Sequence, residues 1–263
     1  MASQSEVGHA KNLANIDKVI NLATQFGITY NPTNPQITLV GLATTKTNCT
    51  TVATNLANIF VTYKNDTNLR EIGYKPVDKL VTAVLDNVKT LNVPQQTIDD
   101  CAALVKKIHG DTKNLQATPA LNKAIDPNNN PIPINDPTAP NTISTSQQSY
   151  DSILANLQKL VLQVQAIPSY APNEANIQTA NLTTLIANLS IANLGAITSI
   201  NAYNLARNQR NLVFYAPSTG LTDIMKKVKS YTRQVYGSQS SEYHQMTAIK
   251  FVRFVVKKKT KKK

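Results

Sequence analysis

The chain has 263 residues, enough for one large domain or two modest ones, with 41% hydrophobic residues and a net charge of +12. Eight glycines in that length are too few for the many tight turns of an all-β protein. Three histidines, 15 scattered acidic residues and two cysteines show no metal-ligand spacing, catalytic motif or disulfide framework, so we expect no enzyme, no metal and no cofactor.

The first predicted helix begins near Leu13, and its apolar residues recur every three to four positions up to Phe26. Gly27 follows directly and favours a left-handed stop. We assign residues 1–11 to an N-terminal tail and residues 12–110 to a first helical repeat.

A long helix is predicted next, with Asn34 as its N-cap and Pro35 at its first position. Its apolar pattern keeps returning to one face as far as Tyr63, and no strong breaker appears before Gly73. Pro76 should then end or kink the helix, because proline removes a backbone donor and clashes with the preceding turn.

Two shorter helices complete the first repeat, over residues 77–88 and 97–108, and Gly110 ends the second of them. A connector of residues 111–149 follows. Six of the 13 prolines lie between Pro119 and Pro140, which excludes a regular hydrogen-bonded ladder there. We interpret this segment as an extended loop.

A second helical repeat is predicted over residues 150–248. It has an opening helix over 153–167, a long helix over 177–203 and a shorter helix from residue 221. The correspondence with the first repeat fades after Gly237, and residues 249–263 form a basic C-terminal tail.

The pattern Tyr-x-Pro marks corresponding places in the two repeats. Its four copies begin at Tyr30, Tyr74, Tyr170 and Tyr215, with offsets of 140 and 141 between the repeats. Neighbouring residues correspond too, since Ile37, Leu42 and Tyr63 have counterparts in Ile177, Leu182 and Tyr203. We predict that each proline fixes a turn, while each tyrosine ring packs on a helical hairpin and its hydroxyl reaches the surface.

These observations predict an all-α fold: an elongated antiparallel helical bundle built from an internal duplication, with kinks and turns at the Tyr-x-Pro elements. The opening and long helices of each repeat should be neighbours, because their connection is short. We expect the helices after Tyr74 and Tyr215 to pack together at one end of the bundle.

The net charge is concentrated near the C-terminus. Residues 1–206 contain 13 basic and 13 acidic residues, whereas residues 207–263 contain 14 basic and only two acidic ones. A flexible polycation neutralises phosphates and releases their counterions without reading sequence. The predicted polyanion-binding residues are Lys226, Lys227, Lys229, Arg233, Lys250, Arg253, Lys257, Lys258, Lys259, Lys261, Lys262 and Lys263.

The leading functional hypothesis is a non-enzymatic helical scaffold or assembly protein whose basic end contacts nucleic acid or a ribonucleoprotein. A homo-oligomer or filament is a further expectation, since long helices with an Ala-Leu seam can pair between chains. Four alternatives stay open: a purely solubilising tail, a tail whose apolar residues Phe251, Val252, Phe254 and Val255 lie with the lysines on an anionic membrane surface, a dedicated nucleic-acid binder, and a membrane-active bundle. The membrane-active bundle would use the charge-free segment of residues 175–206. The membrane surface is a less favoured partner than a nucleic acid. The start of the chain lacks an export signal, so a cytoplasmic location is expected.

The repeated Tyr-x-Pro turns, the paired long helices and the segments 148–151 (Gln-Ser-Tyr-Asp) and 170–174 (Tyr-Ala-Pro-Asn-Glu) resemble an uncharacterised all-helical family of Bacteroidota bacteria. The resemblance covers most of the chain. It implies a helical fold and a bacterial intracellular setting, and it brings no activity and no site residue.

Overall fold

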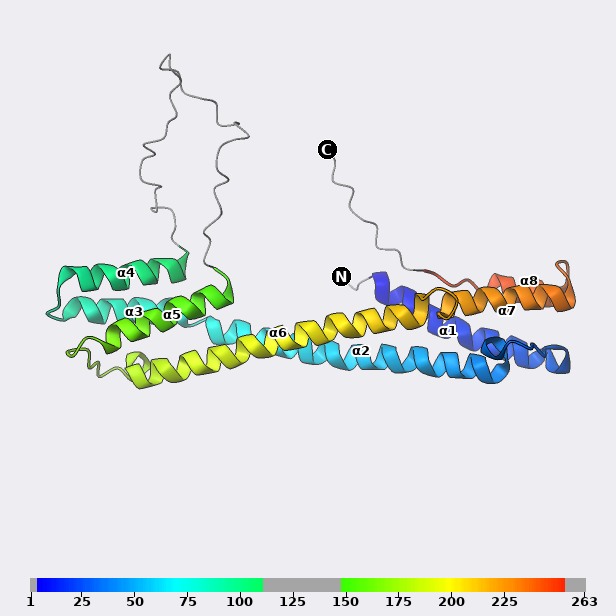
Figure 1. Ribbon diagram of the computed structural model, residues 1–263, viewed down its shortest axis with the longest axis horizontal. Helices are drawn as coiled ribbons and strands as arrows, with labels where there is room; N and C mark the ends of the chain where they lie inside the picture. Colours follow the sequence, from blue (N-terminus) through cyan, green and yellow to red (C-terminus); the bar gives the residue numbers. More distant parts are fainter. Residues whose placement is uncertain (1–3, 111–147, 254–263) are drawn as a thin grey trace, which may run out of the picture. The chain divides into compact units, whose positions relative to one another are not determined.

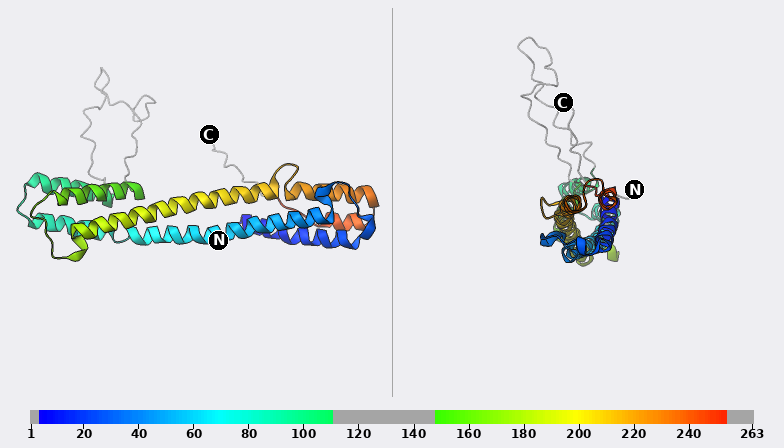
Figure 2. Two further views of the ribbon diagram at one scale, coloured as in Figure 1. Left: turned by 60° about the horizontal axis from the view of Figure 1, so that its bottom comes forward. Right: turned by 90° about the vertical axis from the view of Figure 1, so that its right-hand side faces the viewer.

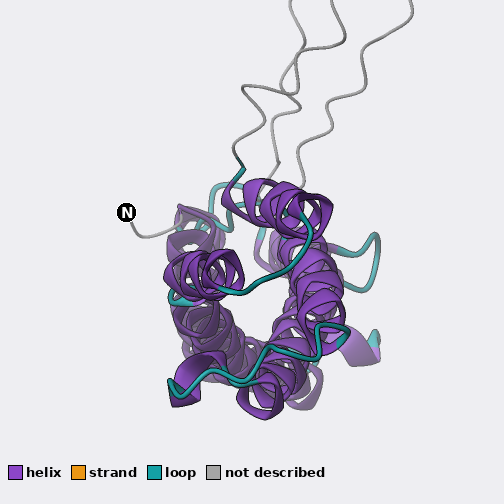
Figure 3. Ribbon diagram, turned by 90° about the vertical axis from the view of Figure 1, so that its left-hand side faces the viewer, coloured by secondary structure: helices purple, strands orange, loops and turns teal. Residues whose placement is uncertain are grey.

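The computed structural model describes residues 4–110 and 148–253. Within these two ranges the chain forms α-helices joined by turns, with no strand, so the predicted all-α fold is confirmed (Figure 3). The helices are α1 (Gln4–Gln25), α2 (Leu39–Tyr74), α3 (Val77–Thr90), α4 (Gln95–His109), α5 (Tyr150–Gln165), α6 (Thr179–Tyr215), α7 (Leu221–Tyr236) and α8 (Ser241–Ala248). The predicted connector falls almost wholly on residues 111–147, outside the described ranges.

Most predicted helix ends are confirmed. Gly27 and Gly110 have φ angles of 61° and 76° and end α1 and α4, and α2 stops at Tyr74, just before Pro76. The start of α2 differs from the prediction. Asn34 does accept a hydrogen bond from the Gln36 N–H (3.0 Å), but it caps only a short 3₁₀ turn, and α2 begins four residues after Pro35.

Helix α1 begins at Gln4, so it includes most of the segment that we assigned to an N-terminal tail. The apolar pattern gives no sign of these first turns of α1, because their inward-facing positions are polar. His9 and Asn12 are both buried there.

The chain divides into two compact units. Unit 1 comprises residues 1–64 and 198–263, and unit 2 comprises residues 65–197. The long helices α2 and α6 each contribute one part to each unit. Each unit therefore combines elements from both predicted repeats.

Unit 1 contains α1, the first part of α2, the last part of α6, α7 and α8, which lie side by side in Figures 1 and 2. The two long helices run antiparallel here, since Thr45 borders the same groove as Val213 while Tyr63 stacks on Tyr203 at 5.1 Å. The buried core is Ile16, Val19, Ala23, Tyr30, Ile37, Leu42, Cys49, Phe214, Tyr215, Leu221, Ile224, Met225, Val228 and Met246. Burial stabilises this unit mainly through aliphatic side chains.

Unit 2 contains α3, α4 and α5 with the remaining parts of α2 and α6. The clustered side chains include Val84 from α3, Val105 from α4 and Leu157 from α5. A polar bridge joins α2 to α5 and α6, because the Arg70 guanidinium lies over the Tyr150 ring at 4.2 Å and donates to Asn193 (3.3 Å). This arrangement fixes the start of α5 against both long helices.

The expectation that the helices after Tyr74 and Tyr215 pack together is wrong. Helix α3 belongs to the core of unit 2, and α7 belongs to the core of unit 1. The physical reason is that each long helix belongs to both units. Helix α2 begins in unit 1 and ends in unit 2, whereas α6 begins in unit 2 and ends in unit 1, so the helices that follow them pack in different units.

The tyrosine hydroxyls of the first turn in each repeat lie inside the protein and not at its surface. Tyr30 donates to the Ile37 carbonyl and Tyr170 donates to the Ile177 carbonyl, both at 2.8 Å. Burial raises the pKa of Tyr170 to about 12 and also raises that of Tyr30, so both hydroxyls stay protonated donors at neutral pH. The matching bonds agree with duplicated turns, while duplication of the whole repeats stays a prediction.

Candidate polyanion-binding surface

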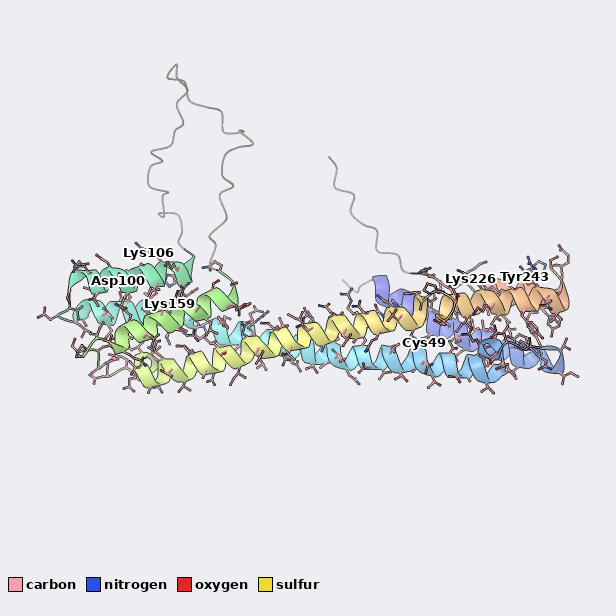
Figure 4. All side chains as sticks on the ribbon, in the orientation of Figure 1. Cys49, Asp100, Lys106, Lys159, Lys226 and Tyr243 are labelled. Carbon is pink, nitrogen blue, oxygen red and sulfur yellow. The ribbon has the colours of Figure 1, made fainter. Side chains whose placement is uncertain are left out.

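Helix α7 positions the first group of predicted cations. It buries Leu221, Met225 and Val228 in the core of unit 1, which leaves the opposite side to its charged residues. Lys226 and Arg233 are seven residues apart and exposed, so they share that outer side. Figure 4 shows Lys226 on the outside of α7, and its side chain is 74% exposed.

Two other lysines of α7 have structural roles. Lys227 donates hydrogen bonds to the Gln36 side chain and to the Ser218 carbonyl, both at 2.7 Å, and so joins α7 to the turns before it and before α2. Lys229 donates to the Ile249 carbonyl at 2.6 Å. Partial burial, followed by the charge of Lys250, lowers the pKa of Lys229. These bonds leave both ammonium groups less available to a phosphate.

The chain after α8 is extended and lies against α1. We call residues Ile249–Arg253 the anchored segment. Asn12 donates to the Val252 carbonyl at 2.8 Å and accepts from the Val252 N–H at 3.0 Å, while Asn15 donates to the Lys250 carbonyl at 2.7 Å. These bonds determine where Lys250 and Arg253 stand. Sequence reasoning missed the role of Asn12 and Asn15, because asparagine on an otherwise amphipathic helix gives no signal of its own.

One acidic residue lies among these cations. Asp223 accepts a hydrogen bond from Lys226 at 2.7 Å, and this bond lowers the pKa of its carboxyl most. The backbone N–H of Ser218 and the charge of Arg253 act in the same direction. Asp223 therefore ties Lys226 to the end of the anchored segment, and it neutralises only one of the positive charges around it.

The structure thus brings part of the predicted site together on unit 1. We call Lys226, Arg233, Lys250 and Arg253 the basic face. Arg253 also donates to the Tyr215 carbonyl at 3.3 Å, so its position is defined by α6 as well. The six remaining predicted residues, Lys257, Lys258, Lys259, Lys261, Lys262 and Lys263, lie outside the described residues.

Three further observations concern a metal site, a groove and a membrane-spanning helix. Among residues 4–110 and 148–253, no group of three or more His, Cys, Asp or Glu side chains could hold a metal ion. An open groove of about 450 Å³ lies between α1 and α2 in unit 1, lined by apolar residues such as Leu56 and Phe60 and by Arg210 of α6. Helix α6 is long and apolar enough to cross a membrane by length and composition alone.

Comparisons with known proteins identify no relative: the chain matches no family model, no curated protein and no solved structure. The functional argument therefore depends on the fold and on the basic face.

Proposed function

We propose that this protein is a non-enzymatic helical scaffold or assembly protein whose C-terminal basic region binds a polyanion such as a nucleic acid. The observation that carries the proposal is the position of the charge. The entire excess of 12 positive charges lies in residues 207–263, and four of those cations form the basic face, where Asp223 is close to Lys226 and Arg253. A compact group of cations next to a lysine-rich segment suits the regularly spaced phosphates of a nucleic acid.

The tail supplies the sequence-independent part of this binding. We expect replacement of the six lysines of residues 257–263 by glutamine to weaken binding of a fluorescein-labelled 20-nucleotide single strand by about 10- to 100-fold at low salt. The slope of log affinity against log salt should fall by up to about 4, because each phosphate contact to a single strand releases roughly 0.7 counterion. Fluorescence anisotropy over a range of NaCl concentrations measures both quantities.

The matched control replaces Lys106 and Lys107 by glutamine; both lie on α4 in unit 2 and neither belongs to the basic face. Figure 4 shows Lys106 on the outside of α4. This variant should change affinity less than twofold. Unchanged affinity after loss of the six tail lysines would remove the polyanion part of the proposal.

The long helices support the assembly part. On the last part of α6, Leu205 and Leu212 are 59% and 63% exposed, and they lie seven residues apart on one side of the helix. Exposed leucines at this spacing form an unpartnered apolar strip of the kind that pairs helices between chains.

We expect the purified protein to form oligomers whose association weakens at least about tenfold when Leu205 and Leu212 are both replaced by serine. Sedimentation over a range of protein concentrations measures the change. The matched control replaces Asn201 and Asn208 by serine, since they are exposed, equally spaced and on the same part of α6. A wild-type protein that stays monomeric at all concentrations would contradict self-assembly.

A further inference from the structure

The groove between α1 and α2 in unit 1 has the composition of a ligand site. Its volume of about 450 Å³ lies within the range of about 300–1,000 Å³ that is typical of sites for small molecules and cofactors. Most of its wall is apolar, with Leu13 from α1 and Leu56 and Phe60 from α2. Two buried polar side chains, His9 and Arg210, complete the lining. The groove therefore suits a ligand that combines an apolar surface with polar and anionic groups.

An aromatic cluster adjoins this groove and shares Phe60 with it. The Phe60 ring centroid lies 5.7 Å from that of Tyr203 on α6 and 6.2 Å from that of Tyr63 on α2. The two tyrosine rings stack at 5.1 Å, with an angle of 8° between their planes. Phe60 is 37% exposed, so the cluster reaches the surface at the edge of the groove. Aromatic rings at a surface provide faces on which nucleobases stack.

Two exposed cations flank the aromatic cluster. The Lys64 ammonium lies 5.6 Å from the Phe60 ring centroid and 5.5 Å from that of Tyr63. The Arg207 guanidinium lies 5.6 Å from the ring centroid of Tyr203. Surfaces that bind single-stranded nucleic acids combine these two elements, because the rings stack on bases and the cations attract the backbone. A duplex presents the same phosphates but keeps its bases paired and stacked within itself.

The groove is connected to the basic face through Tyr215. The ring centroid of Tyr215 lies 5.3 Å from that of His9, which lines the groove. The Tyr215 carbonyl accepts a hydrogen bond from Arg253, which belongs to the basic face. All of these residues belong to unit 1. One strand can therefore place a base at the groove and phosphates on the basic face.

We propose that the groove and the aromatic cluster form a base-stacking site for single-stranded nucleic acid, in which a base stacks on Phe60 while Lys64 and Arg207 contact neighbouring phosphates. This inference rests on the proposed function, and it narrows the polyanion to a strand whose bases are accessible. A surface made only of cations does not distinguish a strand with bases from one without them. The site therefore adds a preference that the basic face alone lacks.

The test compares two fluorescein-labelled 20-nucleotide strands of equal charge, oligothymidine and a strand of abasic sugar-phosphate units. We expect the full-length protein to bind oligothymidine about 10-fold more tightly than the abasic strand, because each stacked base adds affinity. Phe60→Leu should remove most of that difference and change affinity for the abasic strand less than twofold. Phe60→Tyr keeps an aromatic ring and should retain the preference. Fluorescence anisotropy measures each affinity.

A second measurement reports stacking directly. The chain contains no tryptophan, so Phe60→Trp introduces a single indole whose emission is quenched when a base stacks on it. We expect quenching by unlabelled oligothymidine and not by the abasic strand. Phe26→Trp is the matched control, because Phe26 is also partly buried beside an aromatic ring in unit 1, with Tyr236 at 5.2 Å, but does not line the groove. Its emission should change little with either strand.

The outcomes separate this site from the proposed function. Equal affinity of the wild type for the two strands, or a preference that persists in Phe60→Leu, would overturn the base-stacking site and leave the polyanion proposal intact. Binding of oligothymidine to Phe60→Trp without quenching would overturn it as well. If neither strand binds the wild type, the proposed function fails. Circular dichroism checks folding, and if Phe60→Leu unfolds, the quenching experiment decides.

Discussion

Two separate chains, residues 1–110 and 148–263, are expected to be largely unfolded alone and to regain native helix content when mixed in equal amounts. The reason is that neither chain contains a complete core. The unit 2 cluster needs Val84 from the first chain and Leu157 from the second, and the unit 1 cluster needs Ile16 from the first and Met225 from the second. An isolated helix without its packing partners is marginal in water.

Far-ultraviolet circular dichroism of each chain and of the mixture measures this effect, and size-exclusion chromatography identifies the complex. A second mixture, in which the 148–263 chain carries Leu157→Ala, provides a control and should assemble more weakly. If either chain alone shows the helix content and cooperative melting of the intact protein, the shared-core description is incorrect.

Replacement of Phe214 by alanine should lower the free energy of unfolding by about 3–5 kcal/mol, the second large effect that we expect. Phe214 is the largest fully buried side chain among the described residues, and its ring centroid lies 4.9 Å from that of His9 and 5.9 Å from that of Tyr215 in the core of unit 1. Its loss removes apolar burial and leaves a cavity that the surrounding helices fill only in part.

Urea denaturation followed by circular dichroism measures the loss. Leu194→Ala on the same helix is the matched control, because its side chain is 65% exposed and its removal should cost less than about 0.5 kcal/mol. Equal effects at Phe214 and Leu194 would mean that the packing around α6 differs from the structure described above.

The helices themselves could be predicted because their signals are local. Apolar residues at helical spacing define α3 and α7, Gly27 and Gly110 supply left-handed stops, and Pro76 ends α2. The pairing of these helices could not be predicted in the same way. The two predicted repeats carry similar apolar patterns, so periodicity alone does not decide whether an element packs within its own repeat or with the other one.

The basic face could be predicted only as a list of cations. The charge count located it in the last 57 residues of the chain, but charge gives no sign that Lys227 and Lys229 donate to backbone and side-chain oxygens within unit 1. Asn12 and Asn15 were missed for a related reason. Their function depends on contacts with residues about 240 positions away, which no local pattern records.

The C-terminal end of α4 and the N-terminal approach to α5 meet in space. Gln148 donates to the carbonyls of Lys107 and Ile108 at 3.0 and 3.2 Å, and a Cβ atom at Gly110 would lie 2.7 Å from the Gln148 side chain. The entropic cost of closing a loop between two points that already touch rises only weakly with loop length, by roughly 0.6 kcal/mol for each doubling. This junction can therefore accept insertions, deletions or an entire passenger domain between Gly110 and Gln148 with little effect on the helices that flank it.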